Sequence, residues 1–407
     1  MNKLFRIYIS AFEGLSKESW MLSLIMLLNR TGGMVIPFMT VYLTTVLGFE
    51  TDEAGLVMSC FGIGALLGSV IGGWLTDKIG AFHVQFFTLL FTAPVFIILS
   101  FLHTVQEVCV AIFVLSLINE CFRPANSAAI TSYAKKGNLT RAFSLNRMSI
   151  NLGFSFGPAL GGFLASISYS WLFYGNSITT FLTSVVFFLY FFRRKERNEA
   201  VEETDQEVPS TEEHEGSPYL DKWFLVFSFF CFLYACAFFQ LLSILPMYYK
   251  EDLGFGQQQI GFILGFNGLF VVIMEMIVVQ YAESKFNIYI SIILGCLSLL
   301  IAYAWLLADH SMMSCYISMM FLSLSEILVL PFISTVAAKR SSEKKRGAYM
   351  GVNGLSISMA FIIMPYLATK LIKNYSYDHL WIINVILLVI AVSGFLFTKK
   401  KMPLHEN

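Results

Sequence analysis

The sequence predicts an all-α polytopic membrane protein with twelve transmembrane helices in two pseudo-symmetric six-helix halves. The first observation behind this prediction is composition: 57% of the 407 residues are hydrophobic, only 13% are charged, and the mean hydropathy is +0.68. A chain this apolar has too little polar surface for a soluble globular protein. The second and third observations are a series of long apolar stretches and an internal repeat at half the chain length.

The apolar stretches are long enough to cross a bilayer, because about 20 helical residues span about 30 Å of hydrocarbon. They do not show the alternation over about ten residues that is typical of barrel strands. The predicted spans are 18–46, 54–76, 83–103, 107–131, 142–167, 172–192, 222–247, 258–280, 288–307, 312–337, 348–372 and 379–398.

The internal repeat relates positions that lie 206 residues apart. A Leu-Gly-Phe segment at 47–49 recurs at this spacing, and the carboxylates of Asp77 and Glu120 recur as Glu283 and Glu326. When both halves are bundles of apolar helices, such a repeat predicts a substrate site near the middle of the membrane, between the halves.

The two halves are expected at 1–192 and 222–407, the second ending in a short cytoplasmic tail, with a polar linker at 193–221. The linker starts basic, turns acidic and is predicted to be disordered. The other connections are short and leave no room for an extramembrane enzyme domain, and no Walker-type loop is present. We therefore expect no enzyme activity, no cofactor and no use of ATP, so that transport must draw on a gradient.

Lysine and arginine residues concentrate in the even-numbered connections and in the tail. This asymmetry predicts that both termini are cytoplasmic, with the first span as an uncleaved anchor in a bacterial inner membrane. The seven cysteines lie within apolar spans or at their edges, without metal-ligand spacing. They are expected to serve packing, and no metal site is predicted.

Between the second and third spans, Gly73, Asp77, Lys78 and Gly80 form a pattern of glycine, acid and base. It resembles the Gly-x-x-x-Asp-Arg/Lys-x-Gly signature of the major facilitator superfamily, and the resemblance extends over essentially the whole chain. In that family the loop is a cytoplasmic gate, although the basic residues that end the motif are missing here. Gly73 permits close helix contact, and Asp77 is expected to pair with a cation such as Arg141 or to face a helix N-terminus across the half interface.

Span five contains a Gly-x-x-x-Gly-Pro-x-x-Gly-Gly pattern, with Gly157, Pro158 and Gly161 at its centre. It resembles a motif typical of the drug/proton antiporter branch of the superfamily. Small residues at every fourth position let another helix approach, and a proline removes a backbone hydrogen bond and permits bending. The alternative is a tight helix-packing face with no bearing on the direction of transport.

Ionisable residues inside the predicted spans are few, and each costs about 2.5 to 3.5 kcal/mol near the centre of the membrane. The candidates among them are Arg30, Glu120, Arg123, Glu275 and Glu326. Glu120 and Arg123 are three residues apart, so they share a helical face and can neutralise each other. Arg30, beside Asn29, could pair with Glu120 as well. Both arginines are candidates for adjusting the charge state of Glu120 and for binding anionic substrate groups. The alternative is that these ions have only a structural role and hold the helices of the bundle together.

Glu326 has no cation within one helical turn of its own span. Glu326 and Glu120 are the candidates to carry or sense protons. An unpaired carboxylate in a low-dielectric environment favours its protonated form, so Glu326 is expected to be the group that titrates while Glu120 stays charged and paired. The Ser-Glu segment followed by proline resembles the tenth-span Gly-Glu segment of several proton-coupled members of the family. The alternative is a permanently protonated glutamate. Glu275 is a candidate for the cavity, with a structural or snorkelling role as its alternative.

Span seven carries an aromatic and polar cluster. The family resemblance places spans one, four, seven and ten around the centre, so Tyr234, Phe238, Phe239 and Gln240 are candidates for an apolar cavity wall. Ordinary packing is the alternative for each of them.

The resulting functional hypothesis is a proton-coupled transporter that works by alternating access and exports amphipathic or drug-like molecules. Proton-coupled uptake of a short peptide or another small zwitterionic or anionic nutrient is the runner-up, and a non-transporting receptor or lipid-scrambling scaffold is a third class. The expected partners are a small-molecule substrate, protons and membrane lipids. No nucleic acid is expected, and the chain is expected to be a monomer.

Overall fold

A computed structural model describes residues 10, 12–33, 35–135, 137–202, 217–242 and 244–403. The helices of the first half are α2 (Lys17–Gly32), α3 (Val35–Thr45), α4 (Thr51–Ile79), α5 (Ala81–Leu99), α6 (Val105–Tyr133), α7 (Leu139–Ile167) and α8 (Tyr169–Glu202). Those of the second half are α9 (Lys222–Phe238), η1 (Phe239–Leu242), α10 (Ile244–Glu251), α11 (Gln257–Lys285), α12 (Ile288–Ala308), α13 (Met312–Arg340), η2 (Glu343–Lys345), α14 (Arg346–Asn374) and α15 (Tyr377–Lys401).

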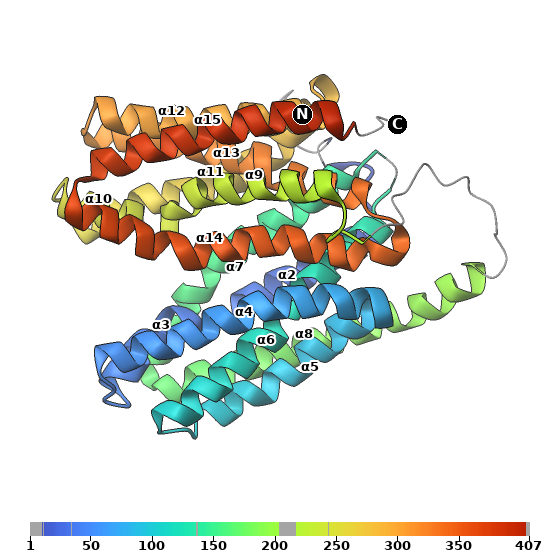
Figure 1. Cartoon of the computed structure of the whole chain (residues 1–407). Coiled ribbons are helices and arrows are strands. Elements are labelled where there is room, and N and C mark those ends of the chain that lie inside the picture. Colours follow the sequence, from blue (N-terminus) through green and yellow to red (C-terminus); the bar gives the residue numbers. More distant parts are fainter. Residues whose placement is uncertain are drawn as a thin grey trace, which may run out of the picture.

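These helices form two bundles of long, roughly aligned helices, one from α2 to α8 and the other from α9 to α15 (Figure 1). Within the described residues, ten helices are long and apolar enough to cross a membrane. α7, and α2 followed by α3, occupy the two further positions, so the arrangement is compatible with twelve spans. Large apolar side chains such as Phe163 and Leu189 are exposed on the outer surface, as expected for helices that face lipid. The predicted fold class is confirmed.

The 206-residue repeat has a direct structural counterpart in the turns that precede α4 and α11. Gly48 and Gly254 both adopt a positive φ, +71° and +67°, which a side chain would disfavour. In both turns the next amide donates back into the preceding helix: Phe49 to the carbonyl of Leu43 at 3.0 Å, and Phe255 to that of Tyr249 at 2.8 Å. The repeated Leu-Gly-Phe segment is therefore a repeated helix-to-helix turn.

Spans one and seven, predicted at 18–46 and 222–247, each contain a break that was not predicted. Span one divides into α2 and α3, and span seven into α9, η1 and α10. The third residue of α3 is Pro37, and the third residue of α10 is Pro246. A proline nitrogen carries no hydrogen, so proline is tolerated in the first turn of a helix but interrupts a helix interior. The two breaks are therefore equivalent features of the repeat.

The apolar span in α8 runs from Tyr169 to Phe192, which matches its predicted end at 192, and the helix itself continues to Glu202. Of the predicted linker at 193–221, residues 203–216 lie outside the described part of the chain. The boundaries of the halves and the disorder of the linker stay predictions.

The basic connections gather at one end of the bundles, which we call the basic end. It contains the segment 134–138 between α6 and α7, the segment 341–345 between α13 and α14, and the lysines at the end of α15. The extension of α8 and the end of α15 lie on this same side in Figure 1. The two halves contact each other chiefly through α4 and α6 with α14 and through α7 with α11 and α13.

Asp221 ties three helices of the second half together near the basic end. It caps α9 by accepting the amide of Phe224 at 3.2 Å, and it also accepts from Arg340 Nε at 2.8 Å and from the Tyr349 hydroxyl at 3.0 Å. Burial alone would raise the pKa of Asp221. Hydrogen bonds from Arg340, the Phe224 amide and Tyr349 outweigh that effect and hold the pKa below its ordinary value.

We expect Asp221→Asn to lower the midpoint of thermal unfolding in detergent at neutral pH. Because the folded-state pKa of Asp221 is depressed, its stabilising contribution is full above the unfolded-state pKa of about 3.9 and is lost as the pH falls through the folded-state value. The difference between wild type and variant should therefore shrink below about pH 4. Tyr349→Phe removes only one of the three donors and should cost less. A difference that stays constant into the acid range would contradict this assignment.

Candidate functional site between the halves

Arg147 of α7 joins the two halves through two buried carboxylates. Its Nε lies 3.2 Å from Oε1 of Glu275 in α11, and its Nη2 lies 2.6 Å from Oε1 of Glu326 in α13. The side chain of Glu275 is 0% exposed and that of Glu326 is 7% exposed. We call Arg147, Glu275 and Glu326 the interface triad.

Amide donors complete the surroundings of Glu326. Asn151, one turn after Arg147 on α7, donates to Oε1 at 3.3 Å, and Asn267 of α11 donates to Oε2 at 3.4 Å and to the hydroxyl of Ser323 at 2.8 Å. The prediction that Glu326 is unpaired is therefore wrong. Its cation comes from the opposite half, so the sequence around Glu326 does not contain it.

The interface triad holds more negative than positive charge when both glutamates are ionised. Two carboxylates face one guanidinium, and Oε2 of Glu275 is buried without a hydrogen-bond partner among the described residues. Uncompensated charge is expensive in a low-dielectric interior. A proton bound at either carboxylate would neutralise the cluster, so the triad has the composition of a proton-binding site.

Glu275 is enclosed and held by Arg147, which agrees with the structural alternative rather than with an open cavity or a snorkelling position. Tyr234 of α9 contacts the same region, since its hydroxyl lies 3.1 Å from the Ser325 hydroxyl, next to Glu326 in the chain. These contacts make Glu275 and Tyr234 part of the wall that encloses the triad.

The ion pair predicted in span four is present. Arg123 Nη2 lies 3.0 Å from Glu120 Oε2, one turn apart on α6. Arg30 of α2 is close enough to interact electrostatically with both, and its neighbour Asn29 is buried. The side chain of Arg123 is 34% exposed and approaches Gly354 of α14 across the half interface. The first half thus carries a partly accessible cationic cluster at the level where the second half carries an acidic one.

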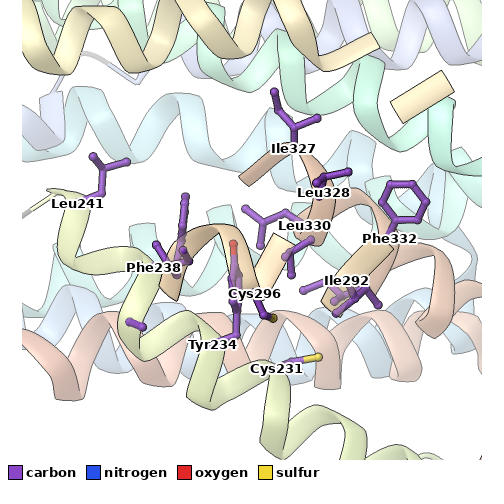
Figure 2. Close-up of a cluster of buried hydrophobic side chains, with 14 of the residues drawn as sticks. Cys231, Tyr234, Phe238, Leu241, Ile292, Cys296, Ile327, Leu328, Leu330 and Phe332 are labelled. Carbon is purple, nitrogen blue, oxygen red and sulfur yellow. The ribbon is translucent and has the colours of Figure 1, made fainter. Parts of the chain in front are cut away.

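The residues predicted as a cavity wall in span seven lie mostly in the interior of the second half. Tyr234 and Phe238 stack at 5.7 Å within a cluster of buried side chains from α9, α12 and α13 (Figure 2). Gln240 is buried and exchanges two hydrogen bonds with Asn384 of α15, at 2.7 and 3.0 Å. Phe239 is half-buried against Phe361 of α14, with ring centroids 4.3 Å apart. Tyr234, Phe238 and Gln240 are each enclosed by their own half in this arrangement, and their place in a cavity wall stays a prediction.

Asp77 closes the basic end by contacting the start of α14 in the other half. Its carboxylate accepts the backbone amides of Gly347 at 2.6 Å and Ala348 at 3.0 Å, which are unsatisfied donors in the first turn of a helix. Of the two partners predicted for Asp77, the helix N-terminus is confirmed, and the prediction of Arg141 is wrong. Gly80 ends the motif with φ +84° and joins α4 to α5, while Lys78 lies over the ring of Trp74.

Arg141 makes the equivalent contact with the repeat counterpart of Asp77. Its Nε lies 3.2 Å from Oε2 of Glu283, near the end of α11. Since α7 and α14 are corresponding helices, each half presents a carboxylate to the first turn of the partner helix in the other half. We call these two contacts the Asp77 latch and the Glu283 latch.

Glycines allow the close approach at the Asp77 latch. A Cβ atom added at Gly73 would lie 2.7 Å from the carbonyl oxygen of Gly347, and one added at Gly347 would lie 2.5 Å from that of Gly73. Backbone atoms cannot rotate away from such a contact. The predicted role of Gly73 in close helix contact is therefore correct.

We expect Gly347→Ala to prevent α4 and α14 from closing at the basic end, at a cost of about 1 to 3 kcal/mol for overpacking. Gly55→Ala is the matched control on α4, because nothing lies within 4 Å of its added Cβ. Substrate transport by reconstituted protein and maleimide labelling at the basic end are the measurements. Wild-type transport and labelling by Gly347→Ala would refute the steric assignment.

The glycine pattern of span five packs α7 against α2. A Cβ atom added at Gly153 would lie 2.5 Å from Cβ of Arg30, and one added at Gly157 would lie 3.2 Å from the Arg30 carbonyl oxygen. Gly161 is buried in α7, and the side chain of Pro158 lies outside the described residues. The pattern therefore positions Arg30 and the helix that carries Arg147.

Arg147 was not predicted as a site residue because it lies near one end of a predicted span. A usable signal does exist in the sequence, since Arg147 and Asn151 are four residues apart within a predicted span and therefore share a helical face. Both contact Glu326.

A family model described as the Major Facilitator Superfamily matches residues 21–342 and 305–407. An uncharacterized MFS-type transporter of Bacillus subtilis (strain 168), YttB, is 24% identical over 384 residues, which cover 93% of this chain and 94% of that protein. A homologue of the multi-drug resistance efflux pump PmrA from Lactococcus lactis subsp. lactis (strain IL1403) is 25% identical over 169 residues, which cover 40% of this chain and 42% of that protein.

Among solved structures, the chain resembles a bacterial homologue of the iron transporter ferroportin in an outward-facing state. The TM-score is 0.73 at 16% sequence identity, and the match covers 94% of this chain and 100% of the other. Similarity at this level of identity concerns the fold alone, and it agrees with the two helical bundles described above.

Proposed function

Because the chain belongs to the Major Facilitator Superfamily, we propose that it is a proton-coupled secondary active transporter that exports amphipathic or drug-like small molecules in exchange for protons. The observation that carries this proposal is the interface triad. It connects the two halves, and its charge changes when a proton binds.

The basic end is proposed to face the cytoplasm of a bacterial inner membrane, following the excess of positive charge in its connections. With the Asp77 and Glu283 latches formed, this side is closed and the chain is in an outward-facing arrangement. Protons then reach the triad from outside, and the halves rock about the central site to expose it to the cytoplasm.

Protonation supplies the switch between the two arrangements. When Glu326 or Glu275 takes up a proton, the carboxylate no longer attracts Arg147 as an ion, so the bond between α7 and the second half weakens. The halves then separate at the basic end, and the proton leaves to the cytoplasm as the substrate binds. Each elementary charge that crosses the membrane contributes about 2.3 kcal/mol per 100 mV.

The proposed substrate class follows from the relatives, the glycine pattern of α7 and side chains near the half interface. The partial similarity to a multi-drug resistance efflux pump homologue and the antiporter-like glycine pattern on α7 favour export. Phe239 and Phe361 provide a half-buried aromatic pair near the break in span seven. Arg123 and Arg30 are suited to bind an anionic group of an amphipathic substrate, and the negative charge of Glu120 partly balances their positive charge.

The uptake alternative requires Glu275 and Glu326 to meet the amine of a peptide. Arg147 already binds both carboxylates, and Glu275 is fully enclosed. Export is therefore the function that we favour.

We expect Glu326→Gln to abolish substrate-driven proton movement in proteoliposomes while the protein still folds. The amide has the shape of the carboxyl group, but it does not gain or lose a proton near neutral pH. Glu53→Gln is the control: Glu53 caps the start of α4 through the amide of Glu50, and Gln259 makes the same contact at the equivalent position of the second half. A lipophilic cation and a dipeptide are the two probes. Full gradient-driven transport by Glu326→Gln would remove Glu326 from the coupling mechanism, and proton movement in the same direction as a dipeptide would favour uptake.

A further inference from the structure

A cavity of about 710 Å³ lies at the basic end beside the Asp77 latch, and the proposed transport cycle does not use it. Its wall comes from both halves: the last turns of α4, the segment before α9, and η2 with the start of α14. A ligand in this cavity would therefore touch both halves at once.

The cavity is lined by more positive than negative charge. Lys78 from the first half and Lys344 and Lys345 from the second half all contribute to its wall. Among the described residues, Asp77 is the one carboxylate in this lining, and its oxygens accept two backbone amides. Lys345 interacts electrostatically with Asp77, but three lysines stand against this one carboxylate, so the described lining can attract an anion. A phosphate group could be approached by lysines of both halves.

An apolar surface leads from the membrane-facing side of α4 into this cationic cavity. Ile63, Leu67, Ile71 and Trp74 follow one another at intervals of three or four residues, and all are exposed. The stripe ends at Lys78, whose Nζ lies 4.7 Å from the centre of the Trp74 ring. Tryptophan and lysine at the end of an apolar helix are typical of the boundary between hydrocarbon and headgroups. A soluble anion would use the lysines, but it would not need the stripe.

We propose that this cavity binds the phosphate-bearing headgroup of an anionic glycerophospholipid, with an acyl chain along the exposed stripe of α4. Because the lysines that meet the phosphate come from both halves, the bound lipid favours the arrangement in which the basic end is closed. An anionic membrane would then stabilise the Asp77 latch without contacting the interface triad. This inference does not depend on which solute is carried or on the direction of transport.

The test is quenching of Trp74 fluorescence by lipids brominated on their acyl chains. The protein is placed in zwitterionic nanodiscs that contain a few mole per cent of brominated phosphatidylglycerol or, for comparison, of brominated phosphatidylcholine. The contribution of Trp74 is the difference between the parent protein and Trp74→Phe. We expect the anionic lipid to quench Trp74 more strongly, and neutralising the lysines to weaken its binding about fivefold per lysine.

A matched control separates a built site from the general attraction of a basic surface. The triple variant Lys78→Gln, Lys344→Gln, Lys345→Gln should lose the preference for anionic lipid. The triple variant Lys399→Gln, Lys400→Gln, Lys401→Gln, which removes three lysines at the end of α15 outside this cavity, should keep it. The triple variant Lys78→Arg, Lys344→Arg, Lys345→Arg should also keep the preference for anionic lipid. This result would show that the loss in the glutamine variant comes from the missing charge and not from a folding defect.

Three outcomes would overturn the proposal. The first is equal quenching of Trp74 by the two brominated lipids, and the second is an equal loss in the two glutamine triple variants. The third is relief of quenching by millimolar glycerol phosphate, which would identify a site for soluble phosphate esters rather than for lipid.

Discussion

Replacing Arg147 by glutamine is expected to abolish proton-coupled transport and to destabilise the folded protein. Among the described residues, Arg147 is the one cation that forms ion pairs with Glu275 and Glu326, and both carboxylates are buried. Removing one partner of a buried ion pair costs about 3 to 5 kcal/mol, because the remaining charge has no compensation. In the variant the two carboxylates must take up protons to remain buried, so the site no longer cycles between a protonated and a free state.

The measurements are the thermal unfolding midpoint in detergent and substrate-driven proton flux in proteoliposomes. Arg147→Gln should lower the midpoint, and the double variant Arg147→Gln, Glu275→Gln should recover part of it because one unpaired carboxylate is gone. Neither the single nor the double variant should couple substrate transport to proton movement. Arg123→Gln is the matched control for the unfolding midpoint, since it also removes an arginine bound to a buried glutamate, but one within the first half and itself 34% exposed, so it should lower the midpoint less. A coupled and stable Arg147→Gln protein would show that the triad is only a packing contact.

The fold could be predicted from the sequence because its signals are large and local. Apolar runs of membrane length predict helices wherever they occur, and the Leu-Gly-Phe repeat marks turns whose hydrogen bonds are nearly identical in the two halves. The breaks of spans one and seven were not predicted, although Pro37 and Pro246 mark both of them. The reason is that a proline can either kink a long helix or begin a new one, and the local sequence allows both.

The site could be predicted only where its contacts lie within one helix. Glu120 and Arg123 are three residues apart, and their ion pair follows from helical geometry. Arg147 meets Glu326 across the interface between the halves, and nothing within a helical turn of either residue indicates the other. For Asp77 the sequence left two partners open, an arginine or a helix N-terminus. The choice depends on how α4 and α14 cross, which is set by the packing of Gly73 on Gly347.

Asp77→Asn is expected to open the basic end, because the Asp77 latch depends on a full negative charge at the start of α14. The carboxylate accepts two amides, whereas an asparagine side chain offers one oxygen and turns an NH₂ group toward a second donor. Hydrogen bonds to charged groups contribute about 1.5 to 3 kcal/mol each, and an anion at a helix N-terminus about 0.3 to 1 kcal/mol. If the free energy that favours the closed basic end falls by roughly 2 kcal/mol, the ratio of closed to open basic ends falls about thirtyfold.

Spin labels at Lys135 and Lys400, which are exposed at the basic end of the first and second halves, report this opening in a background without the native cysteines. The distance distribution of Asp77→Asn should shift to longer values. Asp309→Asn is the matched control, since Asp309 also accepts a backbone amide, that of Ser311 at 3.1 Å, but at the opposite end and within one half. Glu283→Gln should open the basic end as well, because it breaks the equivalent contact with Arg141, and the double variant should open it further. An unchanged distribution in both single variants would mean that glycine packing between α4 and α14, rather than the two carboxylates, holds the basic end closed.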